Sequence, residues 1–275
     1  MRRLVIRPGG IGDTILAFPA IEHLKTGYTE VWVRGDVVPL VRFADRVRSI
    51  ASTGLDLLEL PDSDPPPDLL QSLRAFDSIV SWYGSNRIEF RERVTALGLP
   101  ARFLSALPDP NTRMHASDFF LQQAGGTGTA IPRIRCDVER SNFAVIHPFS
   151  GSGRKNWPID RFHDLAARMP IPVRWCAGRE ESLDGAMRLE NLWDLARWLA
   201  RARLYIGNDS GITHLAAAVG TPVVAIFGPS DLQIWAPRGE RVRIVSGELA
   251  NISVNQVCHL VRELLSTGLP SKEDL

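Results

Sequence analysis

The chain has 275 residues, of which 44% are hydrophobic and 23% are charged, and its formal net charge is +1. This length allows one large α/β domain or two smaller ones, and the balanced charge gives no sign of a nucleic-acid-binding surface. The three cysteines, Cys136, Cys176 and Cys258, form no CxxC pair. They therefore predict neither a disulfide framework nor a zinc site, and we expect buried thiols in a reducing cytosol.

Apolar runs alternate with helical patterns along the whole chain. The predicted strands are 4–6, 30–33, 47–50, 78–82, 143–146, 173–176, 204–206, 223–227 and 242–245. The predicted helices are 14–25, 37–43, 68–76, 86–97, 116–124, 159–169, 192–202, an alanine-rich segment that Gly220 stops, and 254–265. Pro19 should kink its helix or mark the true first turn, and Pro158 suits a first helical position.

Segment 125–132, which is rich in glycine and small polar residues, is the best linker candidate. We place the domain boundary within 126–142 and assign 1–135 to an N-terminal domain and 136–275 to a C-terminal one. Alternating strands and helices in both halves predict two parallel-sheet, Rossmann-like domains. The N-terminal apolar run is too short for a signal peptide, and the longest apolar region, 212–227, is too interrupted to span a membrane.

Four segments that follow predicted strands carry polar, reactive residues, and ligands of parallel α/β sheets bind beyond the carboxyl ends of strands. These segments are 8–13, 147–155, 178–181 and 207–214. The first contains Gly9, Gly10 and Gly12, which spell neither GxGxxG nor a P-loop but let the backbone approach a ligand closely.

The segment Asp209-Ser210-Gly211 precedes the alanine-rich helix, where free backbone N–H groups favour an anion such as a diphosphate. Ser210 can either cap the helix or donate to a phosphate oxygen. His214, four residues further on, shares that helix face. The alternative is an Asx turn with a helix cap and a core histidine.

One pair of cations, one pair of glutamates and one aspartate can each be interpreted either as ligand-binding or catalytic residues or as structural ones. Lys155, beside Arg154 in a glycine–serine loop, could neutralise a leaving diphosphate or be a solvated charge. Glu180 and Glu181 could accept hydrogen bonds from ribose hydroxyls or form an exposed acidic pair. Asp13 could be a general base or a helix N-cap.

Metal-dependent chemistry has one formal match, a DxD motif at 62–64. Its place in a proline-rich loop favours a solvated turn, and no cluster of histidine, cysteine and carboxylate residues has metal-ligand spacing. No GxSxG nucleophile elbow occurs either.

Taken together, the motifs resemble glycosyltransferase family 9, the heptosyltransferases. The resemblance rests on the segment from Asn208 to Pro222, on Phe227-Gly-Pro-Ser-Asp231 with Trp235, and on the opening loop 8–13 with Pro19-Ala20. His147-Pro148, Lys155-x-Trp-Pro158 and Gly178-x-Glu-Glu181 also fit that pattern. Position 10 is glycine where many relatives have serine, and the stretch from about 35 to 125 contains no matching motif.

The resemblance implies a GT-B fold, in which two Rossmann-like domains face each other across a cleft. It implies an inverting, metal-independent transfer of heptose from an ADP-heptose donor, held mainly by the C-terminal domain, to a lipopolysaccharide core approached from the N-terminal domain. No cofactor is implied. Asp13 would be the base and Lys155 would stabilise the leaving diphosphate. The implied donor-binding residues are Gly10, Gly12, Ser150, Glu180, Glu181, Leu192, Asp209, Ser210, Gly211 and His214.

Two other functions stay open: a nucleotide-sugar epimerase of the same architecture, and a non-catalytic nucleotide-sugar binding protein with a shortened acceptor domain. We expect a cytoplasmic protein whose contact with a lipid-linked acceptor is peripheral, at the inner membrane. Six arginines of the first half could serve such contact, although interspersed acids favour an ordinary solvated face. The oligomeric state is not encoded in any recognisable pattern.

Overall fold

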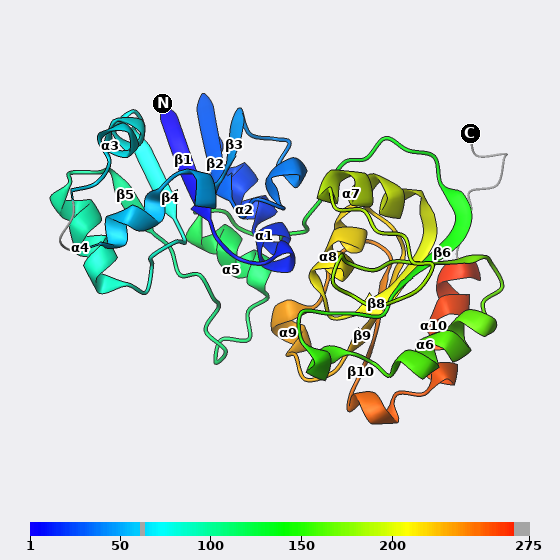
Figure 1. Ribbon diagram of the computed structural model, residues 1–275. Helices are drawn as coiled ribbons and strands as arrows, with labels where there is room; N and C mark the ends of the chain where they lie inside the picture. The colour runs from blue at the N-terminus through cyan, green and yellow to red at the C-terminus, as the bar shows by residue number, and fades with distance from the viewer. Residues whose placement is uncertain (61–63, 267–275) are drawn as a thin grey trace. The chain divides into compact units, whose positions relative to one another are not determined.

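The computed structural model describes residues 1–60 and 64–266. The chain forms two compact units, Met1–Ala130 and Ile131–Leu275. Each unit contains one five-stranded sheet with parallel strands and flanking helices (Figure 1). The prediction of two Rossmann-like parallel-sheet domains is therefore confirmed. The first two residues of the DxD motif lie outside the described residues.

The first unit has the strand order β3-β2-β1-β4-β5. Its strands are β1 (Arg2–Arg7), β2 (Tyr28–Val33), β3 (Arg46–Ser49), β4 (Ser78–Ser81) and β5 (Ala101–Phe103). Its α-helices are α1 (Ile11–Leu16), α2 (Phe18–His23), α3 (Pro67–Arg74), α4 (Ile88–Ala96) and α5 (Ala116–Gln123). Short 3-10 turns cover Val38–Leu40, Ile50–Ser52 and Leu55–Glu59.

Side chains of β1 alternate between two buried faces, as expected for a central parallel strand. Leu4 and Ile6 join a core with Leu73 of α3 and Phe90 of α4. On the opposite face, where α2 packs against α5, Arg7 lies over the ring of Phe120. Burial of both faces explains why the centre of β1, Leu4-Val5-Ile6, is apolar.

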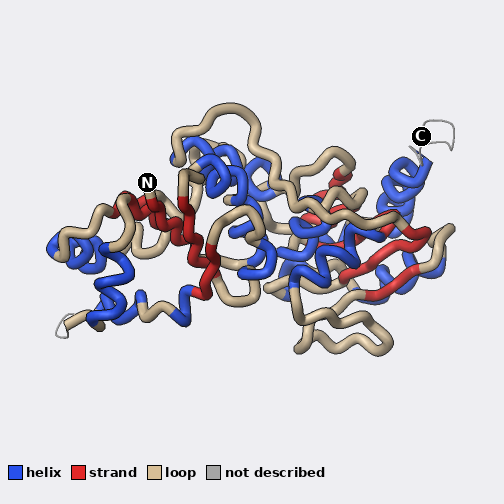
Figure 2. The backbone as a smooth tube through the Cα atoms, turned by 90° about the horizontal axis from the view of Figure 1, so that it is seen from above, coloured by secondary structure: helices blue, strands red, loops and turns tan. Residues whose placement is uncertain are grey.

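The second unit has the strand order β10-β9-β8-β6-β7. Its strands are β6 (Ser141–His147), β7 (Val173–Trp175), β8 (Ala202–Asn208), β9 (Val223–Phe227) and β10 (Val242–Ser246). Its α-helices are α6 (Ile159–Ala167), α7 (Leu192–Arg201), α8 (Gly211–Ala218), α9 (Leu232–Trp235) and α10 (Val254–Ser266). Two 3-10 turns cover Gly153–Lys155 and Leu249–Asn251. Figure 2 shows the strands of this sheet side by side with helices around them.

Two helical layers cover the second sheet. Leu204 and Ile206 of β8 pack with Phe162 of α6 and Val257 of α10 on one face. The intervening Tyr205 points to the other face, where its hydroxyl lies 3.1 Å from the hydroxyl of Thr213 in α8. The small side chains of α8 allow this helix to lie close to the sheet, and six of its eight residues are buried.

Several local predictions need correction. Strand β5 and helix α9, of three and four residues, were not predicted. The expected helix over 37–43 is only a 3-10 turn. Pro158 occupies the N-cap of α6 rather than its first helical position, whereas Pro19 does lie in the first turn of α2. Cys176 and Cys258 are buried as predicted, and Cys136 is half-buried.

The end of α8 depends on Gly220. Its φ is +82°, and its N–H donates to the carbonyl of Ala217 at 3.0 Å while the N–H of Thr221 donates to that of Ala216 at 3.1 Å. This pair of bonds is a Schellman motif, which requires a left-handed residue after the helix. The motif turns the chain directly into β9.

We expect Gly220→Ala to lower the free energy of unfolding by about 1 kcal/mol, since an added Cβ is strained at positive φ although no atom obstructs it within 4 Å. Gly220→Asn should lose less, because asparagine tolerates this conformation better. Urea denaturation of both variants checks the effect, with Gly153→Ala, an unobstructed glycine with ordinary φ, as control. Equal stability of the alanine and asparagine variants would contradict it.

Candidate functional site

In each sheet one pair of neighbouring strands marks the point where the strand order reverses, and α/β folds bind ligands beyond the carboxyl ends of such pairs. The pair is β1 and β4 in the first unit and β6 and β8 in the second. The segments that follow β6 and β8 contain Ser150, Lys155, Asp209 and Ser210. The topology thus brings two of the predicted loops together.

Asn208 joins these two loops. Its side chain is fully buried; its Nδ2 donates to the carbonyl of Pro148 at 2.7 Å, and its Oδ1 accepts from the backbone N–H of Trp157 at 3.0 Å. Both ends of one amide are therefore used to hold the loop after β6 against the end of β8. The loop has a fixed base on which Lys155 is carried.

Lys155 and Asp209 form an ion pair, with Nζ 2.7 Å from Oδ2. The aspartate side chain is 7% exposed and the lysine side chain 36%. Ser230, from the segment after β9, donates to the same oxygen of Asp209 at 2.5 Å. Lys155 is therefore not a freely solvated charge: it is a half-exposed cation held at the carboxyl edge of the sheet.

The amino end of α8 lies beside this pair in sequence and is capped by its own residues. Ser210 is the N-cap, and its Oγ accepts from the N–H of Thr213. The hydroxyl of Thr213 donates in turn to the carbonyl of Asn208. Burial raises the pKa of Tyr205, so the phenol beside Thr213 stays neutral. Ser210 thus caps the helix, and the remaining N–H groups of its first turn stay a suitable site for an anion.

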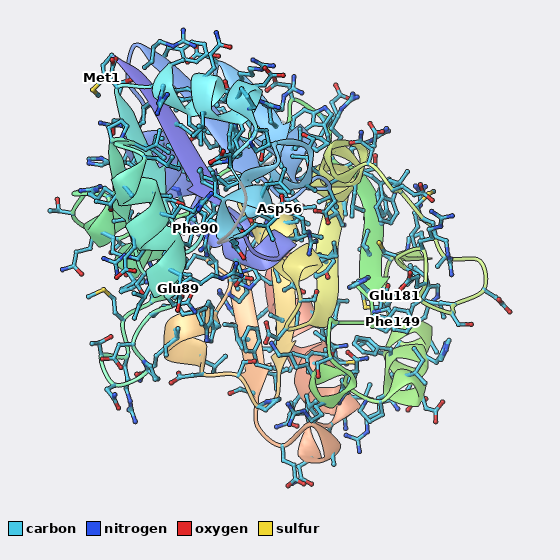
Figure 3. All side chains as sticks on the ribbon, turned by 60° about the vertical axis from the view of Figure 1, so that its left-hand side comes forward. Met1, Asp56, Glu89, Phe90, Phe149 and Glu181 are labelled. Atoms are coloured by element: carbon cyan, nitrogen blue, oxygen red, sulfur yellow. The ribbon has the colours of Figure 1, made fainter. Side chains whose placement is uncertain are left out.

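Glu181 and Glu180 lie in different environments. One oxygen of Glu181 accepts from the N–H of Gly178 at 2.5 Å and lies 3.2 Å from Nε2 of His147. Burial alone would raise the pKa of Glu181, but the hydrogen bonds from His147 and Gly178 and nearby positive charge outweigh it and lower the pKa. Glu180 is exposed. Figure 3 shows Glu181 close to Phe149, whose ring is 6.1 Å from that of His147.

Four other predicted donor-binding residues lie in the second unit. Ser150 donates to Oδ1 of Asn156 at 2.7 Å within its loop. Leu192 is the first residue of α7, and it is buried. Gly211 is the first residue of α8 and His214 the fourth, with the imidazole largely buried. The donor-binding roles of these four residues stay predictions.

In the first unit the Asp13 side chain lies against the backbone of Gly9 and Gly10. Gly10, not Asp13, is the N-cap of α1, and its N–H donates to Oδ2 of Asp13 at 3.0 Å. The alternative of Asp13 as an N-cap is therefore wrong. A Cβ on Gly9, whose φ is +126°, would lie 3.0 Å from Cβ of Asp13, so a side chain there would collide with it. Gly12 is the second residue of α1.

Arg7 is a buried cation that the sequence interpretation did not single out. It is 2% exposed, and its Nη2 donates to the carbonyl of Asp13 at 3.1 Å. Its guanidinium carbon lies 4.3 Å from the ring centre of Phe120 and 5.7 Å from that of Trp82. Burial lowers the pKa of Arg7 to about 10, and the charge of Asp13 partly opposes this. A charged residue ending an apolar strand was the available signal.

Among residues 1–60 and 64–266, no group of three or more histidine, cysteine and acidic side chains is placed to hold a metal ion. In the same ranges, none of the helices combines the length and the apolar character that crossing a bilayer requires.

The fold is that of known glycosyltransferases. The structure of Escherichia coli ADP-heptose lipopolysaccharide heptosyltransferase II matches 97% of this chain and 99% of its own with a TM-score of 0.75 at 15% identity. The iron-containing dodecameric glycosyltransferase TibC from enterotoxigenic E. coli matches 97% of this chain and 76% of its own with a TM-score of 0.65 at 15% identity. At these identities the likeness defines the fold class.

The sequence is similar to one family of glycosyltransferases over part of its length. Residues 173–261 match the model of glycosyltransferase family 9 (heptosyltransferase). Lipopolysaccharide heptosyltransferase 1 of E. coli O18:K1:H7 is 27% identical over 144 residues, which cover 46% of this chain and 44% of that protein. The matched part is thus less than half the length of that curated relative. These matches agree with the resemblance to glycosyltransferase family 9 that the motifs predict.

We expect Glu181→Gln to lower the free energy of unfolding at pH 7 by about 1 kcal/mol, because two hydrogen bonds lose a charged acceptor. A lowered pKa means that this stabilisation is complete above the unfolded-state pKa of about 4.3 and is lost as pH falls through the folded-state value. The difference between wild type and variant should therefore shrink below about pH 4.3. Urea denaturation between pH 7 and 3.5 measures it. An equal effect of Glu180→Gln, at an exposed position, would contradict the assignment.

Proposed function

We propose that this chain is an inverting glycosyltransferase that moves a heptose, or a related sugar, from an ADP-activated donor to a lipopolysaccharide core or a similar glycan acceptor. One observation carries the proposal: the ammonium group of Lys155 is held by Asp209 immediately before the capped amino end of α8, in the unit that contains the matched family segment. The similar proteins are ADP-heptose and lipopolysaccharide heptosyltransferases, which supports the donor and acceptor classes.

The donor's diphosphate is the anion that this part of the second unit suits. As the bond between the sugar and the diphosphate breaks, negative charge develops on the leaving phosphate. A lysine and the N–H groups of a helix start stabilise such charge without reorganisation. We assign this task to Lys155, Ser210 and Gly211, with Ser150 as a further phosphate donor.

The remaining donor contacts follow from the family pattern. Glu180 or Glu181 would bind the ribose hydroxyls, since acids at strand ends do so in nucleotide-binding folds. Leu192 would line the adenine, and Asp209 and His214 would contact the sugar or the phosphates. Gly10 and Gly12 would let the backbone of the first unit come close to the donor sugar.

Asp13 is the proposed general base. The acceptor hydroxyl oxygen forms a bond to the anomeric carbon, its proton passes to the Asp13 carboxylate, and ADP leaves with the electron pair of the broken bond. A single displacement of this kind inverts the anomeric centre. The cations and N–H groups of the second unit supply the positive charge, so the proposal includes no metal ion. A lipid-linked acceptor would be met at the cytoplasmic face of the inner membrane, through peripheral contact.

A thermal-shift screen against nucleotides tests the donor class. ADP and ADP-sugars should raise the melting temperature, whereas UDP-, GDP- and CMP-sugars should not. A ligand present at a hundred times its Kd stabilises the folded state by about 2.7 kcal/mol by mass action, which is easily measured. Stabilisation by a different nucleotide alone would reject ADP as the donor nucleotide.

We expect Asp13→Asn to reduce transfer by a factor of about 10² to 10⁴, the usual contribution of a general base, with the Kd for ADP unchanged. Asp68→Asn, at an exposed aspartate in the first turn of α3, is the matched control and should keep full activity. Treatment with EDTA should leave the wild-type rate unaltered. Full activity of Asp13→Asn would reject the mechanism, loss of activity with EDTA would reject metal independence, and donor conversion without acceptor would indicate an epimerase.

A further inference from the structure

Asp209 is the meeting point of three loops of the second sheet. It follows β8 directly, and its backbone N–H donates to the carbonyl of Ile226 in β9 at 3.0 Å. Lys155 reaches its carboxylate from the loop after β6, and Ser230 does so from the loop after β9. Both donors use the same oxygen, Oδ2. Among the described residues, no side chain or N–H group donates to Oδ1.

Ser230 is held in place from both sides. Gly228, two residues before it, lies so close to Leu249 that an added Cβ would be 2.8 Å from the leucine side chain. The following Asp231 is the N-cap of α9 and accepts from the N–H of Gln233 at 2.9 Å. Ser230 therefore sits between a close packing contact and a helix cap, and its hydroxyl is 2.5 Å from Asp209. This donor is fixed by its surroundings.

Lys155, by contrast, is a donor that can leave. Its side chain is 36% exposed, and it is carried by a loop in which four glycine or serine residues, 150–153, immediately precede Arg154. A diphosphate carries more negative charge than one carboxylate and attracts the ammonium group more strongly. When Lys155 turns toward a diphosphate, the nearly buried Asp209 loses a charged partner, and a buried carboxylate without donors is costly.

We propose that Ser230 is a positioning residue that keeps Asp209 hydrogen-bonded and in place when Lys155 moves to the diphosphate of a bound nucleotide. Ser230 acts through Asp209 and does not itself contact the ligand. The inference rests on the proposed function, because it requires a diphosphate ligand, and it assigns a role to a family-motif residue that has none in the transfer reaction described above.

Isothermal titration of the full chain with ADP and with adenosine tests the role. We expect Ser230→Ala to weaken ADP binding about tenfold, because the loss of a hydrogen bond to a charged group makes the departure of Lys155 harder. Adenosine, which has no phosphate, should bind with unchanged Kd. Ser230→Thr retains the hydroxyl and should bind ADP within about twofold of wild type. Ser246→Ala, at the exposed end of β10, is the matched control.

A double-mutant cycle identifies the route of the effect. In an Asp209→Asn background, Ser230→Ala should cause no further loss of ADP affinity, since the charged acceptor is already gone. Fully additive losses would overturn the inference, because Ser230 would then act independently of Asp209. If Ser230→Ala does not fold, Ser230→Cys, which has a similar size and a much weaker donor, is compared in the same cycle.

The outcomes separate this inference from the proposed function. Wild-type protein that binds no ADP would reject the proposed donor, and the role of Ser230 with it. Wild type that binds ADP, with Ser230→Ala equal to it, would overturn the role of Ser230 alone. Equal losses for ADP and adenosine would also overturn it, because they would show a general distortion of the binding site rather than a phosphate-linked effect.

Discussion

The side chain of Asn208 is the constraint on which the candidate donor site depends. It is fully buried and bridges the backbone of Pro148 and Trp157, so the loop after β6 cannot move away from the end of β8 without leaving buried polar groups unpaired. Such groups cost about 1–3 kcal/mol each. Lys155 lies two residues before Trp157, and Asp209 directly follows Asn208, so the ion pair is adjacent in sequence to both ends of this bridge. A long, mobile side chain is thereby confined to one small region by a rigid amide.

The two units solve the problem of placing charge at a sheet edge in different ways. In the second unit the cation, Lys155, is half-exposed and paired with a carboxylate. In the first unit the cation, Arg7, is buried between aromatic rings and binds the carbonyl rather than the carboxylate of Asp13. The buried guanidinium holds the backbone of the turn, so the Asp13 carboxylate is left to the N–H of Gly10. This arrangement suits the proposed role of Asp13 as a proton acceptor, whereas the half-exposed Lys155 suits the proposed binding of a diphosphate.

Much of the fold could be predicted from sequence, because central parallel strands are buried on both faces and read as apolar runs. Strand β5, Ala101-Arg-Phe103, was missed because it begins with alanine, a poor strand former, whereas the equally short β7 contains valine and tryptophan and was predicted. Helix α9 was missed because its four residues are too few to show a helical period. The loops of the site were predictable from the rule that ligands bind beyond strand ends. Their internal pairing was not: Lys155 and Asp209 are 54 residues apart, and His147 and Glu181 are 34 apart. The strand order determines which loops become neighbours, and the strand order cannot be predicted from sequence periodicity.

The structure connects the segment that matches the family model with one site residue outside it. The matched segment, 173–261, contains Asp209, Ser210 and Ser230 but not Lys155 or Asp13. Lys155 is connected to the matched segment by its 2.7 Å contact with Asp209, and both belong to one unit. Asp13 has no such connection among the contacts within its unit, where its partners are Gly10 and Arg7. Donor binding is therefore supported by sequence and geometry together, whereas the role of the base depends on the opening motif and on chemistry, which is why the Asp13 variant is the decisive one for catalysis.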